Sequence, residues 1–318
     1  GTQSELFYEL YKQPSIRQTG PSKNLVFIYA ESMERSFFDQ NIFPGLISGL
    51  RDIESKSMSF TDIRQVEGVG WTMGGIVASQ CGIPLLYAPA NANSMSKMKD
   101  FLPLAHGLGD LLHEEGYYLS FWGGANPAFG GKGNFFTSKK FDEVYGKNQL
   151  LDKIPDRSNI HRWGLYDDDL LNLAFQRFLE LSETKEKFGL FVLTVDTHAP
   201  DGNPSKSCRN IVYQDGSNSY LNAVACSDFL ISEFVHRIME SPYYKNTVVV
   251  VFSDHLAHGN SASFLLKKTD RKNLFMISSQ EISHSATNSK TGSALDIGTT
   301  LLPFMGYTGA IGLGRNLC

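Results

Sequence analysis

Short, uniformly apolar runs alternate along this chain with longer segments of mixed polarity. The runs at 24–30 (NLVFIYA), 189–195 (GLFVLTV) and 247–252 (TVVVVF) hold few polar positions, which is typical of strands buried on both faces. Segment 165–183 instead repeats its apolar residues at helical spacing. The whole pattern predicts strands at 24–30, 60–66, 117–122, 189–195, 247–252 and 273–278, and helices at 44–56, 72–80, 106–115, 165–183, 219–240 and 293–304.

Strands that alternate with helices indicate an α/β fold with a largely parallel central sheet sandwiched by helices. A chain of 318 residues suits one large domain of this kind. We expect residues 1–20, which are polar and lack a clear period, to be a linker or an arm lying on a domain formed by residues 21–318. The glycine-rich stretch 123–134 is predicted to be irregular.

Composition excludes some classes of protein. A hydrophobic content of 42% with 12% aromatic residues is enough for a sizeable core. The net charge of -4 and the absence of a basic stripe argue against nucleic acid as a partner. No apolar run has the length of a transmembrane helix, and no charged leader with an apolar core follows Gly1, so we expect neither a spanning segment nor a signal peptide here.

The four cysteines are Cys81, Cys208, Cys226 and Cys318, and none belongs to a C-x-x-C pair. That spacing argues against a zinc ribbon or a redox motif. Cys208 and Cys226 flank a polar stretch that is typical of a loop. A disulfide closing this loop in an oxidising compartment and a set of idle thiols both fit the sequence.

Polar residues with metal-binding chemistry follow two of the apolar strands. Glu31 comes directly after 24–30, and Asp254 with His255 comes after 247–252. Thr72 lies in the segment 70–75 (GWTMGG), where an extended segment should turn into a helix. Because the carboxyl ends of strands in an open α/β sheet meet at one edge, these four side chains can converge.

Two carboxylates, an imidazole and a hydroxyl make a hard, oxygen-rich site for a divalent cation. A cation there would favour the alkoxide of Thr72, which is the activation that a hydroxyl nucleophile needs. Glu31 as a surface carboxylate and Thr72 as a helix N-cap would explain either residue alone. These alternatives do not explain both together with the Asp-His pair after a valine-rich strand.

The ordered set of motifs resembles the phosphoglycerol transferase and lipoteichoic acid synthase family of the alkaline phosphatase and sulfatase superfamily. The set consists of Glu31 after the first strand, the turn at Thr72, T-H-x-P at 197–200 and S-D-H at 253–255. The resemblance runs from Asn24 to the C-terminus. It implies an alkaline phosphatase/sulfatase-like catalytic domain over residues 21–318.

The resemblance also implies roles for residues. The metal would be held by Glu31, Thr72, Asp254 and His255, with Thr72 as the nucleophile. We expect one divalent cation, Mn²⁺ first, with Mg²⁺ or Zn²⁺ as alternatives. His198 matches a histidine that contacts the substrate phosphate, where an imidazolium can donate to an oxygen or protonate a leaving alkoxide. A hydrogen-bonded loop histidine is the alternative.

Four further positions are expected to bind substrate. Lys132 stands where relatives carry an arginine that grips the headgroup, and lysine offers a point charge in place of a fork. The same stretch lacks the His and Trp of the synthases, and Asn126 and Asn134 are expected to supply replacement hydrogen bonds. Trp163 lies in a segment that resembles one near the family's site. Alternatives are a solvated lysine in a glycine loop and, for the segment of Trp163, an ordinary helix start with acidic residues in its first turn.

The activity that the resemblance implies is transfer of phosphoglycerol from phosphatidylglycerol to periplasmic glucans through a glycerophospho-threonine. The domain would be periplasmic and would reach the inner membrane through a segment absent from this chain. An oxidising compartment then favours a Cys208–Cys226 disulfide. Three alternatives stay open: a lipoteichoic acid synthase-type polymerase, a phosphodiesterase, and a catalytically silent module that binds glucan or lipid headgroups.

Overall fold

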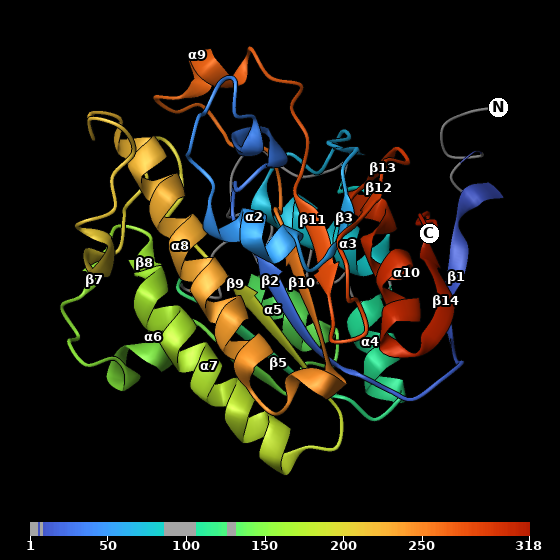
Figure 1. Cartoon of the computed structure of the whole chain (residues 1–318). Helices are drawn as coiled ribbons and strands as arrows, with labels where there is room; N and C mark the ends of the chain where they lie inside the picture. Colours follow the sequence, from blue (N-terminus) through green and yellow to red (C-terminus); the bar gives the residue numbers. More distant parts are fainter. Residues whose placement is uncertain (1–5, 7–8, 86–105, 126–131) are drawn as a thin grey trace.

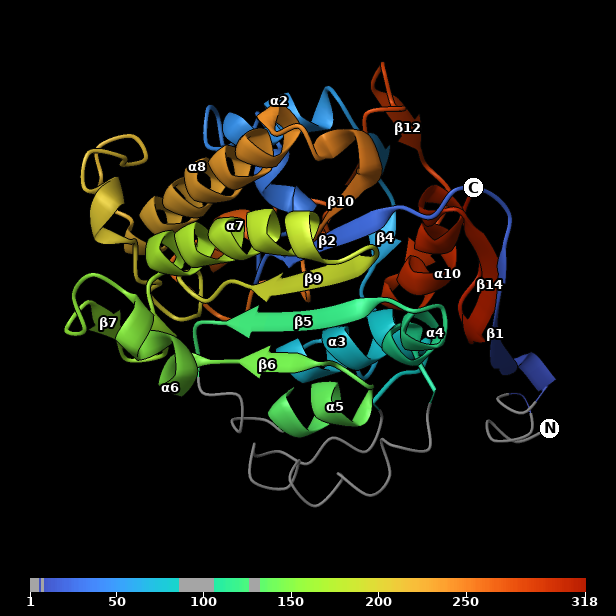
Figure 2. The ribbon, with the colours of Figure 1, turned by 90° about the horizontal axis from the view of Figure 1, so that it is seen from below.

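A computed structural model describes residue 6 and residues 9–85, 106–125 and 132–318. These residues form a central eight-stranded sheet with helices on both faces, together with two-stranded sheets at its periphery (Figures 1 and 2). The central strands in spatial order are β12 (Ala286–Asn288), β3 (Met58–Phe60), β11 (Phe275–Ser278), β10 (Thr247–Phe252), β2 (Asn24–Tyr29), β9 (Phe188–Leu193), β5 (Tyr118–Gly123) and β6 (Glu143–Tyr145). The peripheral pairs are β1 (Lys12–Gln18) with β14 (Tyr307–Gly312), β13 (Gly292–Ser293) with β4 (Ile63–Arg64), and β7 (Ile160–His161) with β8 (Gly164–Leu165).

The direction of the strands confirms the predicted, largely parallel sheet. Strands β10, β2, β9, β5 and β6 run parallel to their neighbours in this block. Strand β11 is antiparallel to both β10 and β3, while β12 is parallel to β3. The fold is therefore α/β, with one antiparallel strand between the parallel block and an edge.

Helices cover the two faces of the sheet, with α2, α7 and α8 on one and α3, α4, α5 and α10 on the other (Figure 2). In β2, Leu25 and Phe27 contact the core under α3 and α10, while Val26 and Ile28 contact the core under α7 and α8. Two-sided burial is why this strand has no polar alternation. The helices are α2 (Gly49–Glu54), α3 (Thr72–Cys81), α4 (Leu108–Glu114), α5 (Lys132–Ser138), α6 (Lys147–Leu150), α7 (Asp167–Thr184), α8 (Ser219–Glu240), α9 (Ser263–Leu266) and α10 (Ile297–Leu301), and the 3₁₀ turns are η1 (Arg35–Phe38), η5 (Leu151–Lys153), η6 (Lys206–Cys208), η7 (Tyr244–Asn246), η8 (Ala294–Asp296) and η9 (Leu302–Met305).

Several element boundaries differ from the predicted ones. The predicted helix 44–56 shortens to α2, because Gly45 has a left-handed φ of 71° and ends any helix there. The arm at 1–20 contains β1, which pairs with β14 far away in the sequence. The prediction that 123–134 is irregular is wrong at its end, where α5 begins at Lys132. Long-range pairing and packing decide these segments, so local sequence patterns do not reveal them.

The predicted disulfide is confirmed. Cys208, at the end of η6, bonds to Cys226 within α8, with their Cα atoms 5.6 Å apart. The bridge ties the long loop between β9 and α8 to the second turn of that helix. Of the other two cysteines, Cys81 is buried and Cys318 is exposed.

Replacing Cys208 and Cys226 together with serine should lower the free energy of unfolding by about 3 kcal/mol, because the unfolded chain regains the entropy of an open loop. Urea unfolding of the variant against the wild type measures this difference. Non-reducing peptide mapping checks the bond itself. Two alkylatable thiols at these positions in unreduced protein would refute it.

Candidate metal centre

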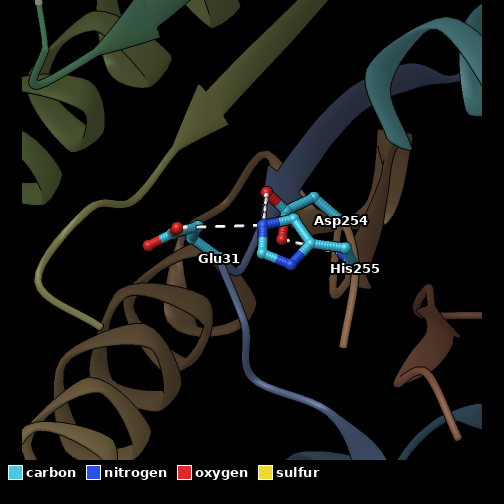
Figure 3. Close-up of side chains that lie close together, drawn as sticks. All are labelled: Glu31, Asp254 and His255. Carbon is cyan, nitrogen blue, oxygen red and sulfur yellow. Dashed lines mark hydrogen bonds and ion pairs between the residues drawn. The ribbon is translucent and has the colours of Figure 1, made fainter. Parts of the chain in front are cut away.

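Two neighbouring parallel strands bring three candidate metal ligands together. Tyr29 at the end of β2 pairs in register with Phe252 at the end of β10, so the residues that follow leave the sheet side by side. Ligand atoms of Glu31, Asp254 and His255 all lie within 4.8 Å of one another (Figure 3). The Nε2 atom of His255 is 3.8 Å from Glu31 Oε1 and 3.4 Å from Asp254 Oδ2.

The hydrogen bonds around these side chains leave electron pairs directed at a common point. The Nδ1 atom of His255 is 2.6 Å from the carbonyl oxygen of Leu256, to which it donates, so Nε2 keeps its lone pair. Asp254 Oδ1 accepts from the amides of Ser32 and His255, at 3.0 and 2.9 Å. Asp254 Oδ2 and Glu31 Oε2 are buried and accept no hydrogen bond within the described part of the chain.

Unpaired carboxylate oxygens are costly to bury, and a cation between them removes that cost. Two such oxygens beside an imidazole lone pair suit a divalent metal ion, so the residues present fit the predicted group. Burial raises the pKa of Glu31 well above its usual range, and the neighbouring charge of Asp254 raises it further. A bound cation would act in the opposite direction and keep Glu31 ionised.

Thr72 lies beside this cluster, as its place in the sequence predicts. It is the first residue of α3, and its Oγ1 is 3.4 Å from Nε2 of His255. Trp71 occupies the N-cap position of that helix, so the alternative role of Thr72 as a cap is wrong. Gly75 permits the approach of α3, because a Cβ there would lie 2.0 Å from the carbonyl oxygen of Asp254.

Lys132 is close enough to act electrostatically on the cluster. It is the first residue of α5 and its side chain is buried. Burial lowers the pKa of Lys132, while the charges of Glu31 and Asp254 act to raise it. The interpretation of Lys132 as a solvated loop residue is therefore wrong.

The structure places His198 in the loop after β9. Its Nδ1 is 2.8 Å from the carbonyl oxygen of Ala199, to which it donates, and this leaves Nε2 available. The Trp163 indole stacks on the imidazole, with ring centroids 3.8 Å apart. Burial lowers the pKa of His198, and the charges of His255, His258 and Lys132 lower it further, so His198 shares the electrostatic environment of the cluster.

The predictions for the two asparagines have different outcomes. Asn134 is exposed on α5, and no hydrogen bond described for this chain joins it to the cluster. Asn126 lies outside the described residues.

His258 lies against the cluster. Its ring stacks on that of His255, with centroids 4.5 Å apart, and its Nε2 is 2.6 Å from the carbonyl oxygen of Gly70.

An ion pair between a buried glutamate and a partly exposed arginine, which the sequence does not reveal, supports the metal-ligand loop. Glu34 is fully buried and receives the guanidinium of Arg271, with bonds of 3.0 and 2.6 Å. It also accepts from the amide of Ala257, whose carbonyl accepts from Arg271. This fork fixes the backbone just after His255. Two charged residues so far apart in sequence give no local signal of their pairing.

The arrangement of ligands and fold agrees with comparisons to known proteins. The pattern of the sulfatase family matches residues 23–307, which is most of the chain. The chain belongs to the sulfatase family. The alkaline phosphatase/sulfatase-like fold that the motifs imply is confirmed.

One curated relative and two solved structures illustrate the similarity. Phosphoglycerol transferase I of Citrobacter koseri is 42% identical over 312 residues, covering 98% of this chain and 41% of the relative. The chain thus spans about two fifths of that protein's length. An alkaline phosphatase superfamily protein from Vibrio parahaemolyticus superimposes with a TM-score of 0.78 at 24% identity, covering 97% of this chain and 73% of the other. The lipoteichoic acid synthase LtaP from Listeria monocytogenes gives a TM-score of 0.77 at 16% identity, covering 98% and 81%.

Proposed function

We propose that this sulfatase-family domain transfers phosphoglycerol from phosphatidylglycerol to a glucan hydroxyl, with Thr72 as the covalent nucleophile. The observation that carries the proposal is the hydroxyl of Thr72 beside a buried Glu31, Asp254 and His255 cluster. The 42% identity to a phosphoglycerol transferase I, over almost all of this chain, supports phosphoglycerol as the group transferred. Phosphatidylglycerol as donor and a glucan as acceptor are what the resemblance of the motifs implies.

Glu31, Thr72, Asp254 and His255 would hold one divalent cation. The preponderance of oxygen ligands favours Mn²⁺ or Mg²⁺, and the single imidazole also admits Zn²⁺. When bound, the cation would favour the alkoxide of Thr72 and offset negative charge on the phosphoryl oxygens.

The residues of the chain then divide the transfer into two displacements. In the first, Thr72 Oγ1, whose proton has passed to solvent, forms a bond to phosphorus, the bond to the diacylglycerol oxygen breaks, and that oxygen takes a proton from His198 Nε2. In the second, a sugar hydroxyl gives its proton to the same Nε2 as its oxygen attacks phosphorus. The bond to Thr72 breaks, and its oxygen leaves as the alkoxide with which the first displacement began.

His198 and Lys132 bind the phosphodiester in this proposal, and Trp163 holds His198 in place. Burial, and then the charges of His255, His258 and Lys132, lower the pKa of His198. A phosphodiester anion beside Nε2 acts in the opposite direction and favours the imidazolium that donates the first proton. Lys132 contributes a buried positive charge near the non-bridging oxygens. Asn126 and Asn134 remain candidates for contacts with the glycerol or sugar.

The proposed location is the periplasm, as a domain of an inner-membrane protein. The Cys208–Cys226 disulfide supports an oxidising compartment. Across the described residues, the helices are too short or too polar to cross a bilayer. Access to phosphatidylglycerol would depend on a segment outside this chain.

The acceptor distinguishes the proposed transferase from its alternatives. With micellar phosphatidylglycerol as donor, added β-glucan should divert product from free glycerophosphate to glycerophosphoryl-glucan, because a bound sugar hydroxyl competes with water for the phospho-threonine. Mass spectrometry of the glucan measures the product. A permethylated glucan, which has no hydroxyl to react, is the matched control and should give only hydrolysis.

Other outcomes would contradict the proposal. Extension of a glycerophosphate oligomer, with the glucan unmodified, would establish the polymerase. Release of glycerophosphate at the same rate with and without every acceptor would establish a phosphodiesterase. Absence of any turnover of glycerophosphodiesters in the metal-loaded protein would favour a binding module.

A further inference from the structure

Two buried carboxylates behind His198 take no part in the steps above. Asp167 begins α7, and Asp196 lies in the loop after β9. Each accepts a hydrogen bond from the other's backbone: the Asp167 amide donates to Asp196 Oδ1 at 3.1 Å, and the Asp196 amide donates to Asp167 Oδ2 at 3.0 Å. Val195 donates its amide to Asp167 Oδ1 at 2.8 Å. These reciprocal bonds, here called the carboxylate clasp, join the start of α7 to the loop that carries His198.

His161 extends the clasp to the segment that carries Trp163. Its Nε2 is 3.2 Å from Asp196 Oδ1, and its Nδ1 is 3.2 Å from the amide nitrogen of Trp163. Because that amide can only donate, Nδ1 is the acceptor and Nε2 carries the proton given to Asp196. Burial lowers the pKa of His161, which favours the neutral ring that these bonds require.

Trp163 transmits this arrangement to the site. Its indole stacks on His198 at 29° between planes, and the guanidinium of Arg162 lies 4.8 Å from the ring centroid of the same tryptophan. On the other side of the loop, Ser205 donates to Asp196 Oδ2 at 2.5 Å. The side chain of Asp196, two residues before His198, is thus held by both His161 and Ser205.

We infer that Asp167, Asp196 and His161 are positioning residues for His198, and that they act by fixing Trp163 against one face of its imidazole. The inference rests on the proposed function in that His198 acts on the substrate phosphate. The physical reason for such a device is that a proton donor must lie within hydrogen-bond reach of the leaving oxygen. Buried polar groups that are all satisfied hold one geometry more strictly than an apolar contact does.

A role limited to stability makes a different prediction from a positioning role. If the clasp only stabilises the fold, breaking it lowers the free energy of unfolding and leaves the ionisation of His198 unchanged in the protein that remains folded. If it positions Trp163, breaking it uncovers His198 to water. The imidazole pKa should then rise toward its ordinary value of about 6.5, because burial is the largest cause of its depression.

The test replaces His161 with phenylalanine, which keeps an aromatic ring and removes both nitrogen atoms. The matched control is His236→Phe, since His236 pairs with Asp52 at 2.7 Å on the surface of α8. Trp163→Ala removes the stacking ring, and Trp163→Phe retains one.

Two measurements are made on each folded variant. The first is the pH titration of the His198 imidazole by NMR in metal-free protein, which does not depend on any activity. The other charged groups that face His198, namely Lys132, His255 and His258, are the same in all variants. The second is kcat/KM for a glycerophosphodiester in metal-loaded protein.

His161→Phe and Trp163→Ala should raise the pKa of His198 and lower kcat/KM about tenfold or more, since small misplacements of a reacting group have effects of this size. Trp163→Phe should keep the His198 pKa and kcat/KM close to their wild-type values, and His236→Phe should match the wild type in both. A folded His161→Phe protein with an unchanged His198 titration would overturn the inference. If His161→Phe does not fold, an unchanged His198 titration in folded Trp163→Ala overturns it instead.

Failure of the proposed function is separately visible. Suppose that the His198 pKa shifts in His161→Phe and Trp163→Ala, but the wild type does not turn over glycerophosphodiesters. That result would refute the transferase and leave the positioning role intact. If the wild type transfers phosphoglycerol and the His198 titration is identical in every variant, the positioning role is refuted and the transferase stands.

Discussion

Replacing Thr72 with alanine is expected to abolish turnover of glycerophosphodiesters and to leave the fold intact. Loss of a covalent nucleophile lowers kcat by about 10⁴-fold or more where the nucleophile acts with its partners as a unit. The structural cost should be small, because Thr72 is only partly buried and Trp71, not Thr72, is the N-cap of α3. We expect the free energy of unfolding to change by less than about 0.5 kcal/mol.

A chromogenic diester measures the rate, and intact-protein and peptide mass spectrometry detect a glycerophosphoryl adduct on the Thr72 peptide of the wild type. Thr72→Ser keeps a hydroxyl and should retain measurable activity. Thr287→Ala, at an exposed position on β12, is the matched control and should behave as the wild type. Wild-type turnover in Thr72→Ala would show that another group is the nucleophile.

The parts of this site that the sequence predicts are those where strand ends carry the ligands. Glu31 and Asp254 each follow a strand whose uniform hydrophobicity marks it as buried, and parallel pairing then places both residues at one edge. The uniform hydrophobicity of the two strands and their parallel direction are thus enough to predict that these residues lie close together. Thr72 was predicted for a related reason, since the segment 70–75 (GWTMGG) is where an extended stretch should turn into a helix.

Residues whose position depends on tertiary packing were predicted less well. Lys132 was expected in an irregular glycine loop but begins a buried helix, because Phe135 and Phe136 of α5 pack into the core beneath the sheet. Strand β1 forms only because β14, at the other end of the chain, offers a partner. Local propensity does not contain such information.

The carboxylate clasp shows a different limit. Asp167 occurs in a run of three acidic residues at the start of α7, which the helix dipole explains adequately. His161 had no assigned role. The available signal was the spacing of His161, Trp163 and Asp167 together with Asp196 just before Thr197 and His198 in the T-H-x-P motif. That spacing has meaning only once β7, β8 and the loop after β9 are known to lie side by side.

Replacing Asp254 with asparagine should remove the metal while preserving the loop that holds it. The Oδ1 atom of the asparagine can still accept from Ser32 and His255, and only Oδ2, which accepts no hydrogen bond, is exchanged for an amide nitrogen. An amide nitrogen has no lone pair for a cation. The variant also lowers the repulsion on Glu31, so metal-free Asp254→Asn should be at least as stable as metal-free wild type.

In the presence of metal, the wild type should be more stable to unfolding than Asp254→Asn. A cation that binds only the folded state stabilises it by about 2.7 kcal/mol at a concentration 100 times its Kd, and we expect this gain in the wild type and not in Asp254→Asn. Elemental analysis of protein purified without chelator should find one equivalent of metal in the wild type and none in the variant. Turnover should be lost in the variant and in wild type treated with EDTA.

Asp228→Asn is the control for loss of a buried carboxylate. Both oxygens of Asp228 accept backbone amides at the start of α2, so this variant should be less stable and yet keep its metal and its stabilisation by metal. The two substitutions therefore separate a structural carboxylate from a ligand. Equal metal content and equal metal-induced stabilisation in Asp254→Asn and wild type, or full wild-type activity in EDTA, would show that the Glu31, Asp254 and His255 cluster is not the metal site.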